Sequence, residues 1–169
     1  PYLFEKHVID SLSINKIKEF ELCKKLLDVG AGGGFPSLIL SIFNSNMNII
    51  AVDSISKKTK FLSYAKEKLN LENLTIINDR IEKIPSLNVD IITNRAVGKI
   101  DLVWNLSKNH RKKGGIFAEQ IFIFFLLSKH RKCQTFSEFL KYFEKFPPCR
   151  KICISEKGVS LEPSNLTKK

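Results

Sequence analysis

Four glycines occupy positions 30 to 34 of the stretch Leu26–Ser37, LLDVGAGGGFPS. Glycine permits positive φ and lets the backbone pass directly against a ligand. The apolar residues before the loop predict a buried strand, and the apolar run Ser37–Phe43 predicts a helix. A strand, a glycine-rich turn and a helix place a ligand at the carboxyl edge of a sheet, where nucleotides bind. The stretch therefore predicts a nucleotide-type cofactor site rather than a turn that serves packing alone.

The spacing of the glycines separates three kinds of nucleotide site. A dinucleotide fingerprint, G-x-G-x-x-G, needs its third glycine where this chain has Phe35, and a P-loop would end in Gly-Lys-Ser/Thr where this chain has Pro36-Ser37. The pattern D-V-G-x-G-x-G is typical of sites for S-adenosylmethionine, which carries no phosphate and needs room for an amino acid and a nucleoside. Asp53, 23 residues after Gly30, follows the next predicted strand at the place where a carboxylate accepts hydrogen bonds from ribose hydroxyls. Loop and acid together favour S-adenosylmethionine.

The elements that must position these residues alternate between strands and helices. This alternation predicts an α/β fold, a doubly wound, Rossmann-like and mostly parallel sheet with helices on both faces. The predicted strands are Lys24–Val29, Ile49–Val52, Leu74–Ile77, Val89–Thr93 and one from Ile116 after a Gly114-Gly115 turn; the predicted helices are Ser37–Phe43, Ser56–Leu69 and one from Ile100 to Leu106. Broken helical spacing over Phe4–Phe20 precedes them, and a hairpin around Lys157-Gly158 ends the chain.

The length of 169 residues predicts one domain with a full core. Residues 1–22 form its helical lead-in, which begins with Pro rather than Met and which we expect to be truncated. Residues 23–117 form the cofactor-binding core. Residues 118–169 form a divergent C-terminal part, in which Phe136, Phe139, Leu140 and Phe143 have helical spacing.

Lys and Arg outnumber Asp and Glu by 28 to 17, for a formal net charge of +11 at pH 7. The excess gathers in three clusters, around Lys57–Lys60, Lys108–Lys113 and Lys129–Lys132. Such clusters favour nucleic acid or an anionic membrane surface as a partner, although charge runs are also commonly solvated faces. They lack regularly interleaved aromatics, which predicts mainly electrostatic RNA binding. The longest apolar run, Ile121–Leu127, is far shorter than the ~20 residues of a membrane-spanning helix, so we expect no membrane partner.

A metal site is the weaker interpretation of the cysteines. His130, Cys133, Cys149 and Cys153 have a spacing that zinc tolerates. The flanking residues lack glycine-containing knuckles, and Cys153 lies in a strand-like alternation. We therefore expect thiols in the reducing cytoplasm and no metal.

Several motifs together resemble one family. LLDVGAGGGFPS is followed by VDS, DRIEKI and TNRAV in that order, and KHVIDSLSI precedes it. These motifs, with EKGVSLEPSNLTKK at the end, resemble the bacterial RsmG/GidB family over residues 5–117 and the C-terminal stretch. The resemblance implies a class I methyltransferase that uses S-adenosyl-L-methionine to methylate N7 of a guanine in small-subunit (16S) ribosomal RNA. It implies 16S ribosomal RNA or the small ribosomal subunit as the partner of a cytoplasmic protein, which we expect to be a monomer.

The resemblance also implies the roles of the site residues. Gly30 and Phe35 would line the cofactor pocket, while Gly32 and Gly34 would permit close approach of the ligand. Ile81 and Glu82 would lie beside the adenine, although Ile81 can also be core and Glu82 a solvated partner of Lys83. Arg95 would be the catalytic residue and would contact the cofactor or the guanosine. It follows the fourth predicted strand, on the same edge as the loop and Asp53, so we expect it to serve transfer more than folding.

Guanine N7 carries no proton, so methyl transfer to it needs no general base, and positioning can supply much of the catalysis. Two other functions stay open. The first is a catalytically inactive remnant that still binds RNA, which the missing lead-in and the unfamiliar segment 119–150 favour. The second is a nicotinamide-dependent oxidoreductase, against which Phe35 counts.

Overall fold

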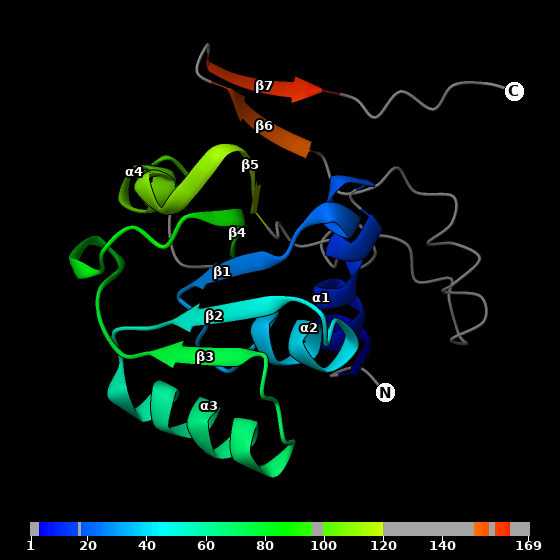
Figure 1. Cartoon of the computed structure of the whole chain (residues 1–169), viewed down its shortest axis with the longest axis vertical. Helices are drawn as coiled ribbons and strands as arrows, with labels where there is room; N and C mark the ends of the chain where they lie inside the picture. Colours follow the sequence, from blue (N-terminus) through cyan, green and yellow to red (C-terminus); the bar gives the residue numbers. More distant parts are fainter. Residues whose placement is uncertain (1–3, 17, 96–99, 120–150, 156–157, 163–169) are drawn as a thin grey trace, which may run out of the picture.

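The computed structural model describes residues 4–16, 18–95, 100–119, 151–155 and 158–162 (Figure 1). Its centre is a five-stranded sheet in the order β3-β2-β1-β4-β5, with all neighbours parallel. The strands are β1 (Lys25–Val29), β2 (Asn48–Val52), β3 (Leu74–Ile77), β4 (Val89–Asn94) and β5 (Arg111–Glu119). The strand order reverses between β1 and β4, which makes a topological switch point at their carboxyl ends. The predicted doubly wound α/β fold is confirmed.

Helices cover both faces of this sheet. On one face, α2 (Ser37–Phe43) and α3 (Ser56–Lys68) pack with the N-terminal segment; on the other lies α4 (Ile100–Ser107). The N-terminal segment is irregular: η1 (Phe4–Ile9), α1 (Asp10–Leu12), η2 (Ser13–Lys16) and η3 (Lys18–Leu22). The broken helical spacing predicted over Phe4–Phe20 is confirmed by this succession of short helical turns.

The inner strands carry consecutive apolar residues, such as Leu26-Leu27 and Ile49-Ile50, because both of their faces are covered. In β1, Leu26 belongs to the core cluster under α2 and α3, whereas Leu27 belongs to the cluster under α4. Ile49 and Ile50 of β2 divide in the same way. Both leucines and Ile49 are fully buried. This two-sided core fixes the carboxyl ends of β1, β2 and β4 at one edge.

The structure corrects the prediction at the fifth strand. Gly114 and Gly115 lie inside β5, which already begins at Arg111. Val89 pairs with Arg111 but Ile91 pairs with Ile116, so the intervening residues of β5 loop out of register. Gly114 has a φ of +77°, which a bulged residue can need and which glycine adopts without strain. The sequence signal for a turn was therefore a signal for a bulge.

The predicted C-terminal hairpin is confirmed as β6 (Lys151–Ser155) paired antiparallel with β7 (Gly158–Glu162). The predicted helix around Phe136–Phe143 and the zinc candidates His130, Cys133 and Cys149 lie outside the described residues. Among the described residues, no helix is long and apolar enough to cross a bilayer. The division of the chain at residues 22 and 117 stays a prediction.

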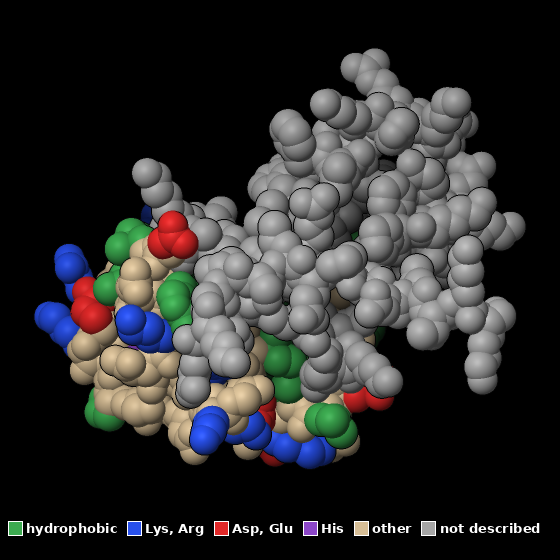
Figure 2. Space-filling model, turned by 90° about the horizontal axis from the view of Figure 1, so that it is seen from above, with side chains coloured by type: hydrophobic (Ala, Val, Ile, Leu, Met, Phe, Trp, Pro, Cys, Tyr) green, Lys and Arg blue, Asp and Glu red, His purple; other side chains and the backbone are tan. Residues whose placement is uncertain are grey.

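One face of the surface is shown in Figure 2. Lys and Arg side chains occur there at several separate places around the described part, with hydrophobic side chains and some Asp and Glu among them. The net positive charge is thus not gathered into a single continuous patch on the described part of this face.

Candidate functional site

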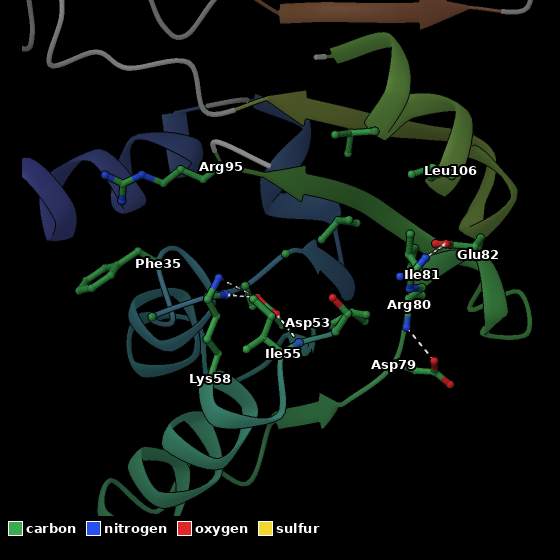
Figure 3. A pocket seen from close by; sticks show the side chains of 18 of the residues that line it. Phe35, Asp53, Ile55, Lys58, Asp79, Arg80, Ile81, Glu82, Arg95 and Leu106 are labelled. Carbon is green, nitrogen blue, oxygen red and sulfur yellow. Dashed lines mark hydrogen bonds and ion pairs between the residues drawn. The ribbon is translucent and has the colours of Figure 1, made fainter. Parts of the chain in front are cut away.

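A cavity of about 700 Å³ opens at the carboxyl edge of the sheet (Figure 3). Its wall comes from the glycine loop, the residues after β2, the segment from Asp79 to Glu82, Arg95 after β4, and α4. His7 of the N-terminal segment also lines it. The structure thereby brings seven of the eight predicted site residues to one cavity; they are Gly30, Gly32, Phe35, Asp53, Ile81, Glu82 and Arg95.

Gly34 is the exception, and its role is packing. A Cβ atom built on Gly34 would lie 2.3 Å from Cδ1 of Leu38 and 2.9 Å from Cδ2 of Leu62. Gly34 therefore lets the loop pack against α2 and α3 rather than against the cavity. At Gly32, by contrast, only the carbonyl oxygen of Gly30 lies near a built Cβ, at 3.6 Å, and φ is +55°. A side chain at Gly32 would have both a strained backbone and an open space to fill.

Asp53 ties the glycine loop to the beginning of α3. Its Oδ2 accepts a hydrogen bond from the Gly32 amide at 2.9 Å, and its Oδ1 accepts one from the Ile55 amide at 2.9 Å. Nζ of Lys58 lies 3.8 Å from Oδ2. The carboxylate is 6% exposed. Because two carboxylate oxygens offer about four acceptor positions, these two amides hold Asp53 in place and leave acceptor capacity for a ligand hydroxyl.

Arg95 is held by two residues of the N-terminal segment. Its Nη2 donates to Nδ1 of His7 at 2.7 Å, and its Nε lies 3.7 Å from Oδ2 of Asp10. A guanidinium can only donate, so Nδ1 of His7 is the acceptor and the proton of the neutral ring is on Nε2. The His7 ring lies 5.0 Å from the Phe35 ring. The N-terminal segment thus links Arg95 to the glycine loop.

The Arg95 guanidinium has unused donor capacity. The side chain is 11% exposed, and its Nη1 is buried without a hydrogen-bond partner among the described residues. Nδ2 of the preceding residue, Asn94, is likewise buried without one. Burial raises the pKa of Asp10, and the Arg95 charge opposes that rise. Unsatisfied buried donors are costly, so the end of β4 is suited to an anionic or carbonyl acceptor.

Ile81 and Glu82 form the wall opposite the loop, in the short helical turn η4 (Ile81–Lys83). Ile81 is 6% exposed and packs in the core below α4, so its side chain has the core role that was the alternative to a ligand contact. The Ile81 carbonyl is 3.1 Å from Nε2 of the buried His110. Glu82 lies 3.9 Å from Arg80 and remains partly exposed. Its carboxylate is available to a ligand in the cavity.

Three residues that sequence reasoning gave no role complete the site. His7 and Asp10 were visible in KHVIDSLSI, but nothing in their spacing indicated contact with a residue 88 positions away. The third is Asp28, buried beneath the loop. Its Oδ2 accepts from the Ser37 amide at 3.3 Å and its Oδ1 lies 3.5 Å from Oγ1 of Thr93. Burial raises the pKa of Asp28 to about 7, and hydrogen bonds from Ser37 and Thr93 limit the rise.

Comparison with known sequences gives one consistent result. The family model described as rRNA small subunit methyltransferase G (GidB) matches residues 1–121. Ribosomal RNA small subunit methyltransferase G of Mycoplasma capricolum subsp. capricolum is 36% identical over 118 residues, which is 68% of this chain and 50% of the relative. The protein of the same name from Fusobacterium nucleatum subsp. nucleatum is 44% identical over 82 residues, 48% of this chain and 35% of the relative. The chain spans about half the length of the curated relatives it matches.

Solved structures agree on the fold. A SAM dependent methyltransferase from Aquifex aeolicus superposes with a TM-score of 0.56 at 23% identity, over 70% of this chain and 66% of the other. TehB from Haemophilus influenzae superposes with a TM-score of 0.51 at 27% identity, over 66% of this chain and 38% of the other. The β3-β2-β1-β4-β5 core is therefore a fold that solved proteins share.

Proposed function

We propose that this chain, which belongs to the rRNA small subunit methyltransferase G (GidB) family, binds S-adenosylmethionine in the cavity and methylates N7 of a guanine in small-subunit ribosomal RNA. The main support for the proposal is that the predicted site residues lie together around one cavity. The glycine loop, Asp53 and Arg95 come from three separate strand ends and line one cavity of about 700 Å³. The proposal places the reaction in the cytoplasm, where ribosomal subunits occur.

The residues of the cavity suit S-adenosylmethionine. Asp53 has acceptor capacity for ribose hydroxyls, and Glu82 has it for the amino group of an adenine. The buried Nη1 of Arg95 has no hydrogen-bond partner in the part of the chain that the structure describes, and a carboxylate such as that of the methionine moiety would supply one. The open space beside Gly32 would accept the part of the ligand that passes the loop. These groups can bind an amino acid and a nucleoside, and none of them needs a phosphate on the ligand.

The protein's contribution to transfer is positional. When bound, the sulfonium supplies an electrophilic methyl group, and guanine N7 attacks it without first losing a proton. Arg95 would orient the cofactor carboxylate or donate to O6 on the guanine edge, which leaves the N7 lone pair free to attack. His7 and Asp10 hold Arg95 at a fixed angle through contacts of 2.7 Å and 3.7 Å. Such fixed alignment can account for a large share of the rate.

Calorimetry tests the cofactor assignment. We expect S-adenosylmethionine and its demethylated product to bind the 169-residue chain with a stoichiometry of one, and NAD not to bind. Asp53→Asn should weaken that binding by about tenfold, because an amide nitrogen cannot accept a ribose hydrogen bond. Asp101→Asn, an exposed acid on α4, is the matched control and should leave affinity unchanged. Binding of NAD instead would overturn the assignment.

A catalytically inactive, RNA-binding remnant is the second candidate, and one observation favours it. The family model matches residues 1–121, so the residues after 121 lie outside that match. Transfer of a radiolabelled methyl group to small-subunit RNA or to assembled subunits separates the two. Label in guanine N7 supports the enzyme, whereas RNA binding with no cofactor binding supports the remnant.

A further inference from the structure

The outer face of α3 carries a regular stripe of aromatic and basic side chains. Lys57, Phe61, Tyr64 and Lys68 are spaced i, i+4, i+7 and i+11, which places them on one side of a helix. This outer stripe faces away from the sheet, because the buried residues of the helix are Thr59 and Leu62. Phe61 is 52% exposed and Tyr64 58% exposed. Two large aromatic side chains are thus presented to solvent between lysines.

We propose that the outer stripe of α3 binds single-stranded RNA beside the cofactor cavity. The inference rests on the proposed function, since it describes how the RNA substrate would be held. Bases stack on exposed aromatic rings with little regard to sequence, while lysines neutralise the phosphates between them. Target nucleotides of enzymes that act on bases must leave a duplex or already be single-stranded. A stacking surface next to the cavity would supply that single-stranded segment.

The charge of α3 selects RNA over a protein helix as the occupant. The helix has the sequence SKKTKFLSYAKEK, with five lysines and one glutamate. Nζ of Lys68 lies over the Tyr64 ring, 5.7 Å from its centre, so a cation is already paired with one of the two aromatic side chains. An apolar partner would leave this many lysines without counter-charges. A polyanion with planar bases complements both kinds of side chain.

A hollow beside the stripe supports the same occupant. It has a volume of about 470 Å³ and lies between α3 and the end of β3. Its wall includes Tyr64, Lys60, Ser63 and Asn78, together with the apolar Ile76 and the acidic Glu67. Hydroxyl, amide and ammonium groups can bond ribose hydroxyls and base edges, which RNA offers and an apolar helix does not. The hollow and the outer stripe share Tyr64, so they form one continuous surface.

The position of the helix connects this surface to the chemistry. In Figure 1, α3 lies along the β3 edge of the sheet. It begins at Ser56, next to Ile55, and Ile55 and Lys58 line the cofactor cavity. From Lys57 to Lys68 the stripe extends by about 16 Å, enough for roughly five nucleotides at the ~3.4 Å spacing of a stacked strand. A bound strand could therefore run from the outer stripe to the cavity mouth.

The helical spacing also corrects the expectation that the lysine clusters lack interleaved aromatics. In the linear sequence, Lys57, Lys58 and Lys60 precede Phe61 as a block. On the helix, Lys58 turns toward Asp53 and Lys57 joins the aromatic rings. RNA binding should accordingly have a stacking part that salt does not screen, in addition to the electrostatic part.

Fluorescence anisotropy with a labelled single-stranded oligoribonucleotide of about 12 nucleotides tests the proposal. Phe61→Ala with Tyr64→Ala should reduce affinity at least about tenfold at every salt concentration, because stacking is lost. Lys57→Ala with Lys60→Ala should flatten the slope of log affinity against log salt by roughly 1.4, the value for two phosphate contacts on a single strand. Phe43→Ala and Lys24→Ala are matched controls, exposed on other elements.

Calorimetry with S-adenosylmethionine is run on the same variants to separate this inference from the proposed function. Unchanged cofactor affinity with weakened RNA binding supports the stripe. Normal RNA affinity and salt slope in both paired variants overturn it, even if the cofactor binds. If the aromatic pair instead abolishes self-association seen by sedimentation, while RNA affinity is normal, the occupant is a second copy of the chain and the RNA proposal is wrong.

Discussion

The two sides of the cavity are built in different ways. The side formed by the glycine loop and Asp53 is local: Asp53 accepts hydrogen bonds from residues 21 positions before it and 2 positions after it. The side formed by Arg95 is distant, since its partner His7 is separated from it by 88 positions. The local side is fixed by backbone amides, and the distant side by side chains. Substitutions should therefore affect the two sides differently.

Asp28 joins the two sides and should give the largest effect, on stability. It accepts from Ser37 behind the loop and lies next to Thr93 of β4. Burial, aided by the nearby charge of Asp53, raises its pKa from 3.8 to about 7. Between these values the folded protein binds more protons than the unfolded chain, so the free energy of unfolding should fall as pH rises from about 4 to about 7. The decrease is on the order of 4 kcal/mol.

Urea unfolding at several pH values measures this decrease. Asp28→Asn should flatten the dependence, because the amide cannot ionise. Asp101→Asn, exposed on α4, should retain it. Asp10, whose pKa burial also raises, contributes a slope of the same sign, and Asp90, whose pKa is lowered despite burial by its contact with Lys112, contributes one of the opposite sign. Both contributions persist in the two variants. The idea fails if Asp28→Asn shows the unaltered slope of the parent protein.

Gly32→Val should disrupt cofactor binding at the local side of the cavity, formed by the glycine loop and Asp53. Its side chain would occupy the open space at the loop and should lower affinity for S-adenosylmethionine by at least about a hundredfold, or ~2.7 kcal/mol. Gly114→Val is the matched control, because Gly114 also has a positive φ, +77°, but meets nothing within 4 Å and does not line the cavity. Both variants should lose similar stability from backbone strain. Equal cofactor affinity in the two, measured by calorimetry, would contradict the placement.

A substitution of Arg95 tests the distant side of the cavity, where the residue that would bind the ligand also pairs with the buried Asp10. Arg95→Ala removes the cation beside the buried Asp10, so it should lower the melting temperature as well as methylation. Asp10→Asn combined with Arg95→Ala should restore much of the melting temperature, since the unpaired charge is gone. Methylation should remain at least about tenfold reduced in both, or ~1.4 kcal/mol of transition-state stabilisation. If the double variant methylates normally, Arg95 is structural.

The same contrast explains what the sequence could predict. The loop, Asp53 and the individual strands follow from spacing within short segments, and the alternation of strands and helices then predicts a parallel sheet whose strand ends meet at one edge. Contacts of Arg95 with His7 and Asp10 depend on how an irregular N-terminal segment packs, which no periodicity encodes. Gly34 shows a different limit: a glycine needed for packing against Leu38 has the same appearance in sequence as one that faces a ligand. The bulge at Gly114 was predicted as a turn because a glycine pair looks the same in sequence whether it ends a strand or lies within one.

Lys58→Ala should change stability least of these variants. It tests whether backbone amides, rather than an ion pair, hold Asp53 on the local side of the cavity. Nζ of Lys58 is 3.8 Å from Asp53 and the lysine side chain is 47% exposed, a geometry in which an ion pair contributes less than about 1 kcal/mol. The Gly32 and Ile55 amides would still hold the carboxylate at 2.9 Å each. We therefore expect urea unfolding to shift by less than about 0.5 kcal/mol, comparable with Lys60→Ala, an exposed neighbour on α3. A loss well above that of Lys60→Ala would mean that Asp53 depends on its cation, and the two sides of the cavity would then be held by side chains alike.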